Sequence, residues 1–343
     1  MRDSKLLMAA ALAVGATLAA APARAQAPVV VNCAFELEWC EALKAKFEET
    51  TGWKAAISRK SDGEIMAQLR AEVGNPRFDV WHSAGADTAA IMAKDGFLDA
   101  YKSPRLGELH DWAQKAAEQS KYTLLPIYMG VIGYGYNTEL LAKKGMPEPK
   151  CWADLTNPAY KNEIQMADPS TSGTAYTMIT TVLQLYGEEK GFEYLKQLHK
   201  NVNQYTRSGS AGIRAAGRGE TTIGVAFLHD SVAQTVQGFP VKTVAPCEGT
   251  GFERQGVAIV KDARNLEGAR KWADFALGVD GQNVSFDQNK YQIQSNKSAK
   301  LHPQAPRPEQ VKMIDYDLFV FATDEARTRI LARFEKEVKT APK

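Results

Sequence analysis

Short apolar runs alternate along the chain with longer segments in which apolar residues recur every three or four positions. Residues 29–31, 53–57 and 78–81 are short runs rich in β-branched and aromatic residues, as in strands, whereas residues 36–50 and 63–73 have the spacing of amphipathic helices. Strands that alternate with helices of this length predict a mostly parallel sheet and therefore an α/β fold.

The loops that follow these strands are candidates for ligand contacts. Ligands of such sheets bind where the strands end and the helices begin, so we expect the loops at residues 34–36 and 83–86 to face one crevice. Residues 82–87 are predicted to form a small-residue loop before a helix at 88–94. Ser83 in this loop is a candidate contact, although capping of the loop explains a serine there at least as well.

The later part of the chain contains a second α/β unit at about residues 137–250. Residues 124–136 are apolar and punctuated by glycine, which is typical of a crossing strand, and residues 256–260 are strongly strand-like. We expect the chain to cross near residues 128–136 and again near 250–257. Two crossings predict two lobes that are joined by a double hinge.

One polar turn stands out in the second unit. A strand that begins at Ile164 ends at Asp168-Pro169, because proline cannot donate to a strand ladder. A helical pattern follows at residues 175–185. The turn between them contains four hydroxyls and a glycine, namely Ser170, Thr171, Ser172, Gly173 and Thr174. A helix N-terminus with small hydroxyl residues can bind an anion without a cationic side chain, and an ordinary helix cap is the alternative.

Residues 1–25 have the features of a secretory signal peptide. Arg2 and Lys5 precede an apolar run at 6–21, and Ala23-Arg24-Ala25 fits a small-x-small cleavage site. The apolar run is too short for a transmembrane anchor. A lipoprotein would have a cysteine at the cleavage point, and this chain has none there. We therefore expect an exported, soluble protein that is located in the periplasm.

The charge balance argues against nucleic acid as a partner. The whole chain has 42 Lys and Arg against 40 Asp and Glu. Arg2, Lys5, Arg24 and Asp3 belong to the predicted signal peptide, so the remaining chain has equal numbers of basic and acidic residues. A nucleic-acid-binding protein is expected to have a basic surface. The length that remains is enough for two domains of ordinary size.

The four cysteines, Cys33, Cys40, Cys151 and Cys247, all follow the predicted signal peptide. An even number in an exported chain suggests disulfides, and three pairings are possible. We predict that Cys33 pairs with Cys40 in a local loop and that Cys151 pairs with Cys247 across distant segments; the alternative is that some remain free and buried. The spacing offers no zinc motif, so we expect no metal site.

Four segments resemble those of a known family. Residues 134–140, 152–158, 167–174 and 217–220 read YGYNTEL, WADLTNP, ADPSTSGT and GRGE. Together they resemble periplasmic substrate-binding proteins of ABC transporters, in the ferric-iron-binding-protein-like family, over nearly the whole exported chain. The resemblance implies the type II periplasmic-binding-protein fold, in which two mixed sheets are flanked by helices and joined by a double-crossover hinge.

The resemblance also bears on the ligand. Ferric-iron binders of this family place two adjacent tyrosines after the strand that here spans residues 225–228, whereas this chain has His229-Asp230 and no adjacent tyrosine pair. The resemblance therefore implies that the iron site is absent. The Leu228-His229-Asp230 sequence, with CEGTGFE at residues 247–253, is similar to the hexose-phosphate-binding branch of the family.

That branch implies roles for individual residues. By resemblance, His229, Asp230 and Glu253 would grip the sugar. The phosphate would lie against Ser170–Thr174, with Ser208 and Gly209 as further candidates. An aminoalkylphosphonate is an alternative ligand, because its ammonium would suit the two carboxylates; ferric iron is the third candidate. We narrowly favour a sugar phosphate, since His229 suits a hydroxyl group.

Each of these residues has a structural alternative. Asp230 would serve equally as the cap of a helix at residues 231–236, and His229 as a packed residue at a strand end. Glu253 would serve as a surface charge at the hinge. Arg207 is treated as solvated and is not included in the predicted site.

An enzyme is the competing class of function. Ser208 and Ser210 near His229-Asp230 suggest a hydrolase triad, but adjacent residues at a strand end point to opposite faces, so the aspartate would orient the histidine poorly. The chain has no Gly-x-Ser-x-Gly elbow. We therefore expect a binding protein without catalytic activity or cofactor.

The expected organisation follows from these inferences. Residues 1–25 are the signal peptide, 26–132 the first part of lobe 1, 133–252 lobe 2, and 253–343 the completion of lobe 1 with the C-terminal helices. The expected partners are a small phosphorylated ligand and an ABC transporter permease in the inner membrane. The protein is expected to be a monomer.

Overall fold

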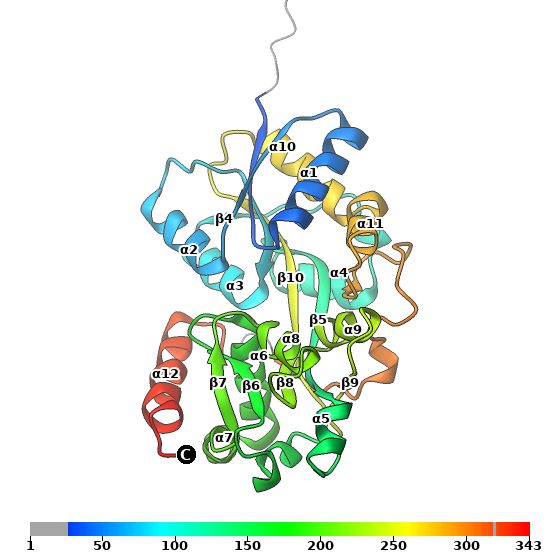
Figure 1. Ribbon diagram of the computed structural model, residues 1–343. Coiled ribbons are helices and arrows are strands. Elements are labelled where there is room, and N and C mark those ends of the chain that lie inside the picture. The colour runs from blue at the N-terminus through cyan, green and yellow to red at the C-terminus, as the bar shows by residue number, and fades with distance from the viewer. Residues whose placement is uncertain (1–26, 318–319) are drawn as a thin grey trace, which may run out of the picture.

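The computed structural model describes residues 27–317 and 320–343. The predicted signal peptide lies outside the described residues. Figure 1 shows two lobes, one above the other, joined by strands that run from one to the other. In the described part of the chain, no helix combines the length and the apolar character that are needed to cross a membrane.

Lobe 1 begins with alternating strands and helices, as the sequence predicts. In chain order its first elements are β1 (Val29–Cys33), α1 (Leu37–Thr51), β2 (Ala55–Arg59), α2 (Asp62–Ala71), β3 (Val80–Gly85), α3 (Ala86–Lys94), β4 (Leu98–Asp99) and α4 (Asp111–Gln119). β1 lies between β2 and β3 and is parallel to both. Helix α1 buries Trp39, Leu43 and Phe47 from its predicted apolar face.

Two long strands form the hinge. β5 (Leu125–Asn137) has 13 residues, all buried, and β10 (Phe252–Val260) is antiparallel to it. The first half of β5 pairs with β10 and with β11 (Ile293–Gln294) in lobe 1, and its second half pairs with strands of lobe 2. The sheets are therefore mixed, and the expectation of mostly parallel pairing is wrong at the hinge because both crossing strands run antiparallel to their neighbours.

Lobe 2 contains the second α/β unit. In chain order its elements are α5 (Thr138–Lys143), β6 (Ile164–Ala167), α6 (Gly173–Tyr186), α7 (Glu188–His199), β7 (Val202–Thr206), α8 (Ala211–Gly217), β8 (Ile223–Phe227), α9 (Leu228–Val236) and β9 (Val241–Val244). β6 is parallel to β7 and β8, whereas β8 and β9 are antiparallel to β5.

The chain then returns to lobe 1 through β10. The remaining helices are α10 (Leu266–Leu277), α11 (Val279–Asp287) and α12 (Asp324–Phe334). Short 3-10 helices lie at Leu106–Glu108, Ala153–Thr156, Pro158–Tyr160 and Pro308–Gln310, and a π-helical turn lies at Glu335–Lys339. Helix α12 packs Ile330 and Phe334 into the core of lobe 2, where Figure 1 shows it in red.

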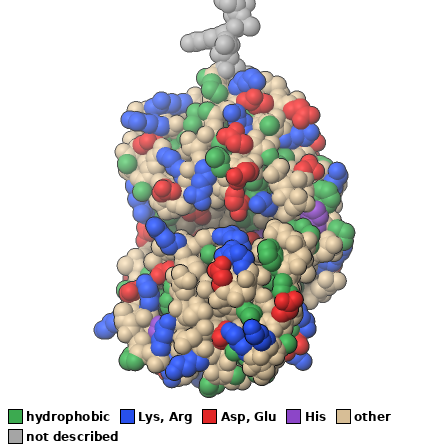
Figure 2. Space-filling view, in the orientation of Figure 1, with side chains coloured by type: hydrophobic (Ala, Val, Ile, Leu, Met, Phe, Trp, Pro, Cys, Tyr) green, Lys and Arg blue, Asp and Glu red, His purple; other side chains and the backbone are tan. Residues whose placement is uncertain are grey.

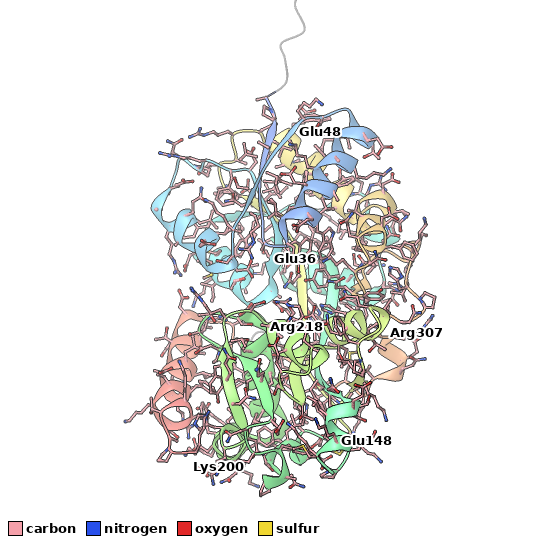
Figure 3. The ribbon with its side chains drawn as sticks, viewed as in Figure 1. Glu36, Glu48, Glu148, Lys200, Arg218 and Arg307 are labelled. Carbon is pink, nitrogen blue, oxygen red and sulfur yellow. A yellow bond between two sulfur atoms is a disulfide. The ribbon has the colours of Figure 1, made fainter. Side chains whose placement is uncertain are left out.

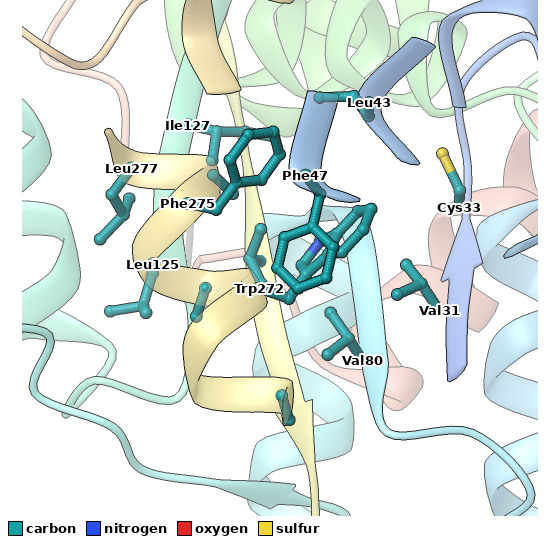
Figure 4. Packing of buried hydrophobic residues seen from close by; sticks show 14 of the residues in the cluster. Val31, Cys33, Leu43, Phe47, Val80, Leu125, Ile127, Trp272, Phe275 and Leu277 are labelled. Atoms are coloured by element: carbon teal, nitrogen blue, oxygen red, sulfur yellow. The ribbon is translucent and has the colours of Figure 1, made fainter. Parts of the chain in front are cut away.

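Each lobe has a hydrophobic core of its own. In lobe 1, Phe47 of α1 packs against Trp272 and Phe275 of α10, with ring centroids 4.8 and 5.4 Å apart (Figure 4). In lobe 2, Trp152 and Tyr134 belong to a separate cluster of buried residues. The two cores share no residue, an arrangement that suits movement of the lobes as units about β5 and β10.

Both predicted disulfides are present. Cys33 at the end of β1 is bonded to Cys40 of α1, and Cys151 is bonded to Cys247 at a sequence separation of 96. The second bond joins the segment before the 3-10 helix at Ala153–Thr156 to the segment that leads into β10.

Two predicted boundaries are wrong. Residues 82–85 continue β3 instead of forming a loop, because β10 pairs with them across the hinge, and α3 begins at Ala86. His229 and Asp230 lie in the first turn of α9 instead of at the end of a strand. Their side chains approach to 3.8 Å, so the expectation that they point to opposite faces is also wrong.

Candidate functional site

A cavity of about 760 Å³ lies between the lobes, where several helices begin. We call it the interlobe cleft. Its lining from lobe 1 is Ala34, Arg59, Ser61, Asp62, Gly63, Glu64, Met66, Ser83, Asp87 and Thr88; from lobe 2 it is Ser170, Thr171, Ser172, Gly173, Arg207, Ser208 and Gly209; Glu253, Gln255 and Arg327 complete it. Figure 2 shows that the surface narrows at the junction of the lobes, with Lys and Arg side chains at the rim.

The predicted polar turn enters the cleft at the start of α6. Ser172 is the N-cap, and its hydroxyl accepts a hydrogen bond from the N–H of Ala175 at 3.4 Å. The hydroxyl of Ser170 donates to the carboxylate of Asp168 at 2.6 Å, and that of Thr171 donates to the carbonyl of Asp168 at 3.3 Å. These two hydroxyls therefore stabilise the turn itself.

The donors that remain at this end come from the helix. The N–H groups of Gly173 and Thr174 lie in the first turn of α6, where an α-helix offers them no acceptor. The partial positive charge of the helix N-terminus adds to them. The turn thus presents backbone donors to the cleft, while its first two hydroxyls hold those donors in place.

The loop at residues 207–209 closes against the same helix start. A side chain at Gly209 would place its Cβ 2.1 Å from Oγ1 and 2.6 Å from Cβ of Thr174. Only glycine permits this approach, because real Cβ contacts are not found below 3.0 Å. Thr174 is absent from the cleft lining because it packs on Gly209.

Glu253 of β10 faces two helix starts. A Cβ on Gly173 would lie 3.6 Å from its Oε1, and a Cβ on Gly85 would lie 3.0 Å from the same atom. Glu253 is buried, and burial, together with the negative charges of Asp87 and Asp62, raises its pKa to about 8. The carboxyl is therefore protonated at neutral pH and can donate as well as accept a hydrogen bond.

Other acids of lobe 1 lie near Glu253. Burial, and next the charge of Asp87, raises the pKa of Asp62 to about 7. Asp62 accepts a hydrogen bond from the indole N–H of Trp81 at 3.1 Å. Asp87 is paired with Arg327 of α12 at 2.6 Å. This ion pair joins lobe 1 to lobe 2 beside the cleft, since α12 packs on lobe 2.

Gln255 organises the predicted residue Ser83. The hydroxyl of Ser83, which has a φ of 65° within β3, donates to Oε1 of Gln255, and the phenol of Tyr128 donates to the same oxygen at 2.6 Å. Nε2 of Gln255 in turn donates to Glu253 at 3.3 Å. Ser83 is thus in the cleft, with its hydroxyl already engaged.

His229 and Asp230 lie on the other side of Tyr128 and are absent from the cleft lining. The ring of His229 packs edge-on against Tyr128, with centroids 6.3 Å apart, and stacks on Phe227. Burial lowers the pKa of His229 to about 3, so the ring is neutral. Burial, and next the charge of Glu36, raises the pKa of Asp230 to about 7.

Two charged residues of lobe 1, one acidic and one basic, act on His229 and Asp230. Glu36 precedes α1 and is paired with Lys290 at 3.3 Å. Figure 3 shows Glu36 at the lower end of lobe 1, facing lobe 2. The predicted site residues therefore form two groups, one in the cleft and one beyond Tyr128, and Tyr128 contacts both.

Several cleft residues were not predicted from the sequence. Arg59, Asp62, Asp87 and Arg327 line the cleft, as does Arg207, which was set aside. The capping box of Ser61 and Glu64 was the available signal for the start of α2. Nothing in the local sequence indicates Arg327, because it comes from the far end of the chain.

The described residues offer few side chains that could together bind a metal ion. The one group of suitable side chains there consists of Cys151, Cys247 and Glu248. Both sulfurs are in a disulfide, and the thiolate is the form that binds a metal.

Residues 76–320 match the family model of the bacterial extracellular solute-binding proteins. An uncharacterised protein of Haemophilus influenzae is 41% identical over 98% of this chain and 97% of its own length.

Two solved structures are similar over most of the chain. The periplasmic binding protein AfuA of Actinobacillus pleuropneumoniae, in a structure with exogenous fructose 6-phosphate bound, is 40% identical, with 92% of this chain and 99% of that chain covered and a TM-score of 0.86. The periplasmic binding protein P5PA is 34% identical, with 91% and 100% covered and a TM-score of 0.84.

Proposed function

Because this chain belongs to the family of bacterial extracellular solute-binding proteins, we propose that it captures a sugar phosphate in the periplasm. It then delivers this ligand, as a monomer, to the permease of an ABC importer. The predicted signal peptide supports export, and the family supports a membrane permease as partner. The chain acts by binding alone and requires no cofactor.

The observation that carries the proposal is the proximity of the carboxyl of Glu253 to the start of α6 at Gly173. The N–H groups at the start of α6 suit an anion, and the protonated carboxyl of Glu253 suits a neutral hydroxyl group. A sugar phosphate offers both at once. The similarity to AfuA, whose structure holds fructose 6-phosphate, supports the same ligand class.

In this proposal the phosphate lies in the cleft against both the start of α6 and the adjacent loop at Ser208 and Gly209. The sugar lies against Glu253 and extends towards His229 and Asp230 beyond Tyr128, which belong to the same lobe as the start of α6. Closure is expected because the ligand-binding groups belong to both lobes.

An aminoalkylphosphonate is the second candidate, because carboxyls of Asp62, Asp87 and Glu253 lie near one another. Asp87 is already paired with Arg327, and Glu253, whose pKa is raised to about 8, would have to lose its proton to pair with an ammonium group. This balance favours the sugar hydroxyls.

Calorimetry on purified protein tests the proposal. Fructose 6-phosphate should bind, and free fructose should bind at least three orders of magnitude more weakly, because charge-assisted hydrogen bonds contribute roughly 1.5–3 kcal/mol each. Inorganic phosphate, an aminoalkylphosphonate and ferric iron complete the series. Equal affinity for fructose and its phosphate would refute the anion site, and tight ferric binding without phosphate would return the protein to the iron-binding branch.

Two substitutions separate the proposed roles. Thr174→Val should weaken binding of fructose 6-phosphate, because the side chain of Thr174 packs on Gly209 and sets the contact between the loop and the start of α6. Asp230→Ala should instead alter discrimination among sugar phosphates while inorganic phosphate binds as before. The same loss of affinity for every phosphate ligand in both variants would contradict this division.

A further inference from the structure

A second cavity lies behind the hinge, outside the interlobe cleft. Its volume is about 160 Å³, and α3, α4, the start of β5 and one residue of β10 form its walls. The lining is Ala86, Ala90, Ala93, Ala116, Gln119, Ser120, Lys121, Thr123, Leu124, Pro126 and Arg254. We call it the hinge-back pocket. It shares no lining residue with the cleft.

The walls of this pocket are apolar. Ala86, Ala116, Leu124 and Pro126 are buried, and exposed residues such as Gln119 form the mouth. An apolar cavity of about 150 Å³ is large enough to hold a benzene ring. The pocket is therefore of the right size for one small ring or a short aliphatic chain.

Arg254 is the one residue in this wall with a buried side-chain donor that has no acceptor among the described residues. Its Nε is buried without a hydrogen bond among the described residues, whereas its Nη1 donates to the amide oxygen of Gln119 at 3.3 Å and its guanidinium lies 5.0 Å from the ring centroid of Phe252. Arg254 has no ion pair in the part of the chain that the structure describes, and burial lowers its pKa. Arg254 is only partly buried, but a buried donor without an acceptor, on a cation without a counter-charge, still costs free energy.

The remaining polar groups do not supply that counter-charge. No acidic residue lines the pocket within the described residues. The hydroxyl of Ser120 donates to backbone carbonyls at 2.9 and 3.0 Å, and that of Thr123 donates to the carbonyl of Ser120 at 2.7 Å. Lys121 at the exposed rim adds a second positive charge.

We propose that the hinge-back pocket is a second ligand site, for a small monocarboxylate with an apolar body. The body lies against the alanine face of α3, and the carboxylate accepts hydrogen bonds from the guanidinium of Arg254. A carboxylate supplies both the missing charge and the missing acceptor for Nε. An uncharged apolar molecule would fill the pocket but leave Arg254 unpaired.

The pocket and the cleft share two short pieces of backbone. Arg254 faces the pocket and the adjacent Glu253 faces the cleft; Ala86 faces the pocket and the adjacent Asp87 faces the cleft. An occupant of the pocket therefore touches the strand and the helix start that carry the cleft carboxyls.

Benzoate and its fluorinated analogue are suitable probes. On ligand-free protein, 4-fluorobenzoate should show saturable broadening of its fluorine NMR signal, and benzoate should compete with it, whereas benzyl alcohol and benzylamine should not. Arg254→Met should weaken binding about tenfold or more, the value of one charge-assisted hydrogen bond. Arg270→Met, which removes an arginine that lies over Tyr101 outside the pocket, should bind as the wild type does.

A second variant covers the case in which Arg254→Met fails to fold. Ala90→Leu leaves Arg254 in place and fills the pocket, so it should also abolish probe binding. Unchanged binding in either folded variant would overturn the proposal. So would displacement of the probe by saturating fructose 6-phosphate, because that result would place benzoate in the interlobe cleft. The measurements on Arg254→Met and Ala90→Leu do not depend on the identity of the cleft ligand.

Discussion

Gly209→Ala is the sharpest test of the phosphate end of the cleft. The new Cβ would lie 2.1 Å from Oγ1 and 2.6 Å from Cβ of Thr174. Rotation of the threonine side chain moves Oγ1 but not Cβ, so the loop and the start of α6 must separate. An ordinary carbon–carbon contact of about 3.5 Å requires a shift of roughly 1 Å.

The expected effect follows from that shift. A phosphate held by both segments would lose one or two charge-assisted hydrogen bonds, each of which contributes roughly 1.5–3 kcal/mol. A loss of about 1.4 kcal/mol of binding free energy raises Kd tenfold. The Kd for fructose 6-phosphate should therefore rise by a factor of about 10 to 100 or more. Isothermal titration calorimetry measures this change directly.

The control is another glycine of the same chain. A Cβ at Gly107 meets nothing within 4 Å, so Gly107→Ala should bind as the wild type does. Thermal unfolding establishes that both variants are folded. A folded Gly209→Ala protein with wild-type affinity would refute the idea that the loop and α6 jointly hold the phosphate.

Three further predictions concern pH, the long disulfide and lobe closure. Folding raises the pKa of Glu253 to about 8, so the folded protein loses stability as pH rises above the pKa that this carboxyl has in the unfolded chain. Glu253→Gln should therefore reduce the fall in Tm of the ligand-free protein between pH 5 and 8. Equal slopes of Tm against pH in the variant and the wild type would contradict the protonated state. Replacing both Cys151 and Cys247 by Ser should lower the free energy of unfolding by about 4–5 kcal/mol in the loop-entropy model, measured by urea denaturation; a loss below about 1 kcal/mol would contradict it. Arg327→Met should increase the radius of gyration of the ligand-free protein in small-angle scattering, whereas Arg329→Met, whose partner Glu188 lies in the same lobe, should not. Addition of fructose 6-phosphate should decrease the radius of gyration of the wild-type protein. An unchanged radius at saturation would argue against closure.

Elements with a strong local signal could be predicted from the sequence. The apolar spacing of Trp39, Leu43 and Phe47 identified α1, and the glycine-punctuated run identified β5 as a crossing strand. Helices α4, α7, α8 and α11 were not predicted. Of these, α8 spans only seven residues, Ala211–Gly217, and two of them are glycine, so its local helical signal is weak.

Pairing across the hinge decided the boundaries that were wrong. β3 extends to Gly85 because β10, more than 150 residues later, supplies its hydrogen-bonding partner. His229 and Asp230 became helical because β8 ends at Phe227, where its pairing with β5 ends. Pairing partners that are distant along the chain leave no trace in the local pattern of apolar residues.

The sequence by itself determined the two-lobed α/β organisation, the double crossing and the polar turn at the start of α6, whereas the structure decided among the three possible cysteine pairings. These features rest on local periodicity and on residue types that limit the backbone, such as proline after a strand. The tertiary structure alone decided which groups meet in the cleft. It protonates Glu253 by burying it beside Asp62 and Asp87, brings Arg327 from the last helix to Asp87, and leaves Arg254 unpaired behind the hinge. Charge states and contacts of this kind depend on burial and on partners from distant segments, which the order of residues does not display.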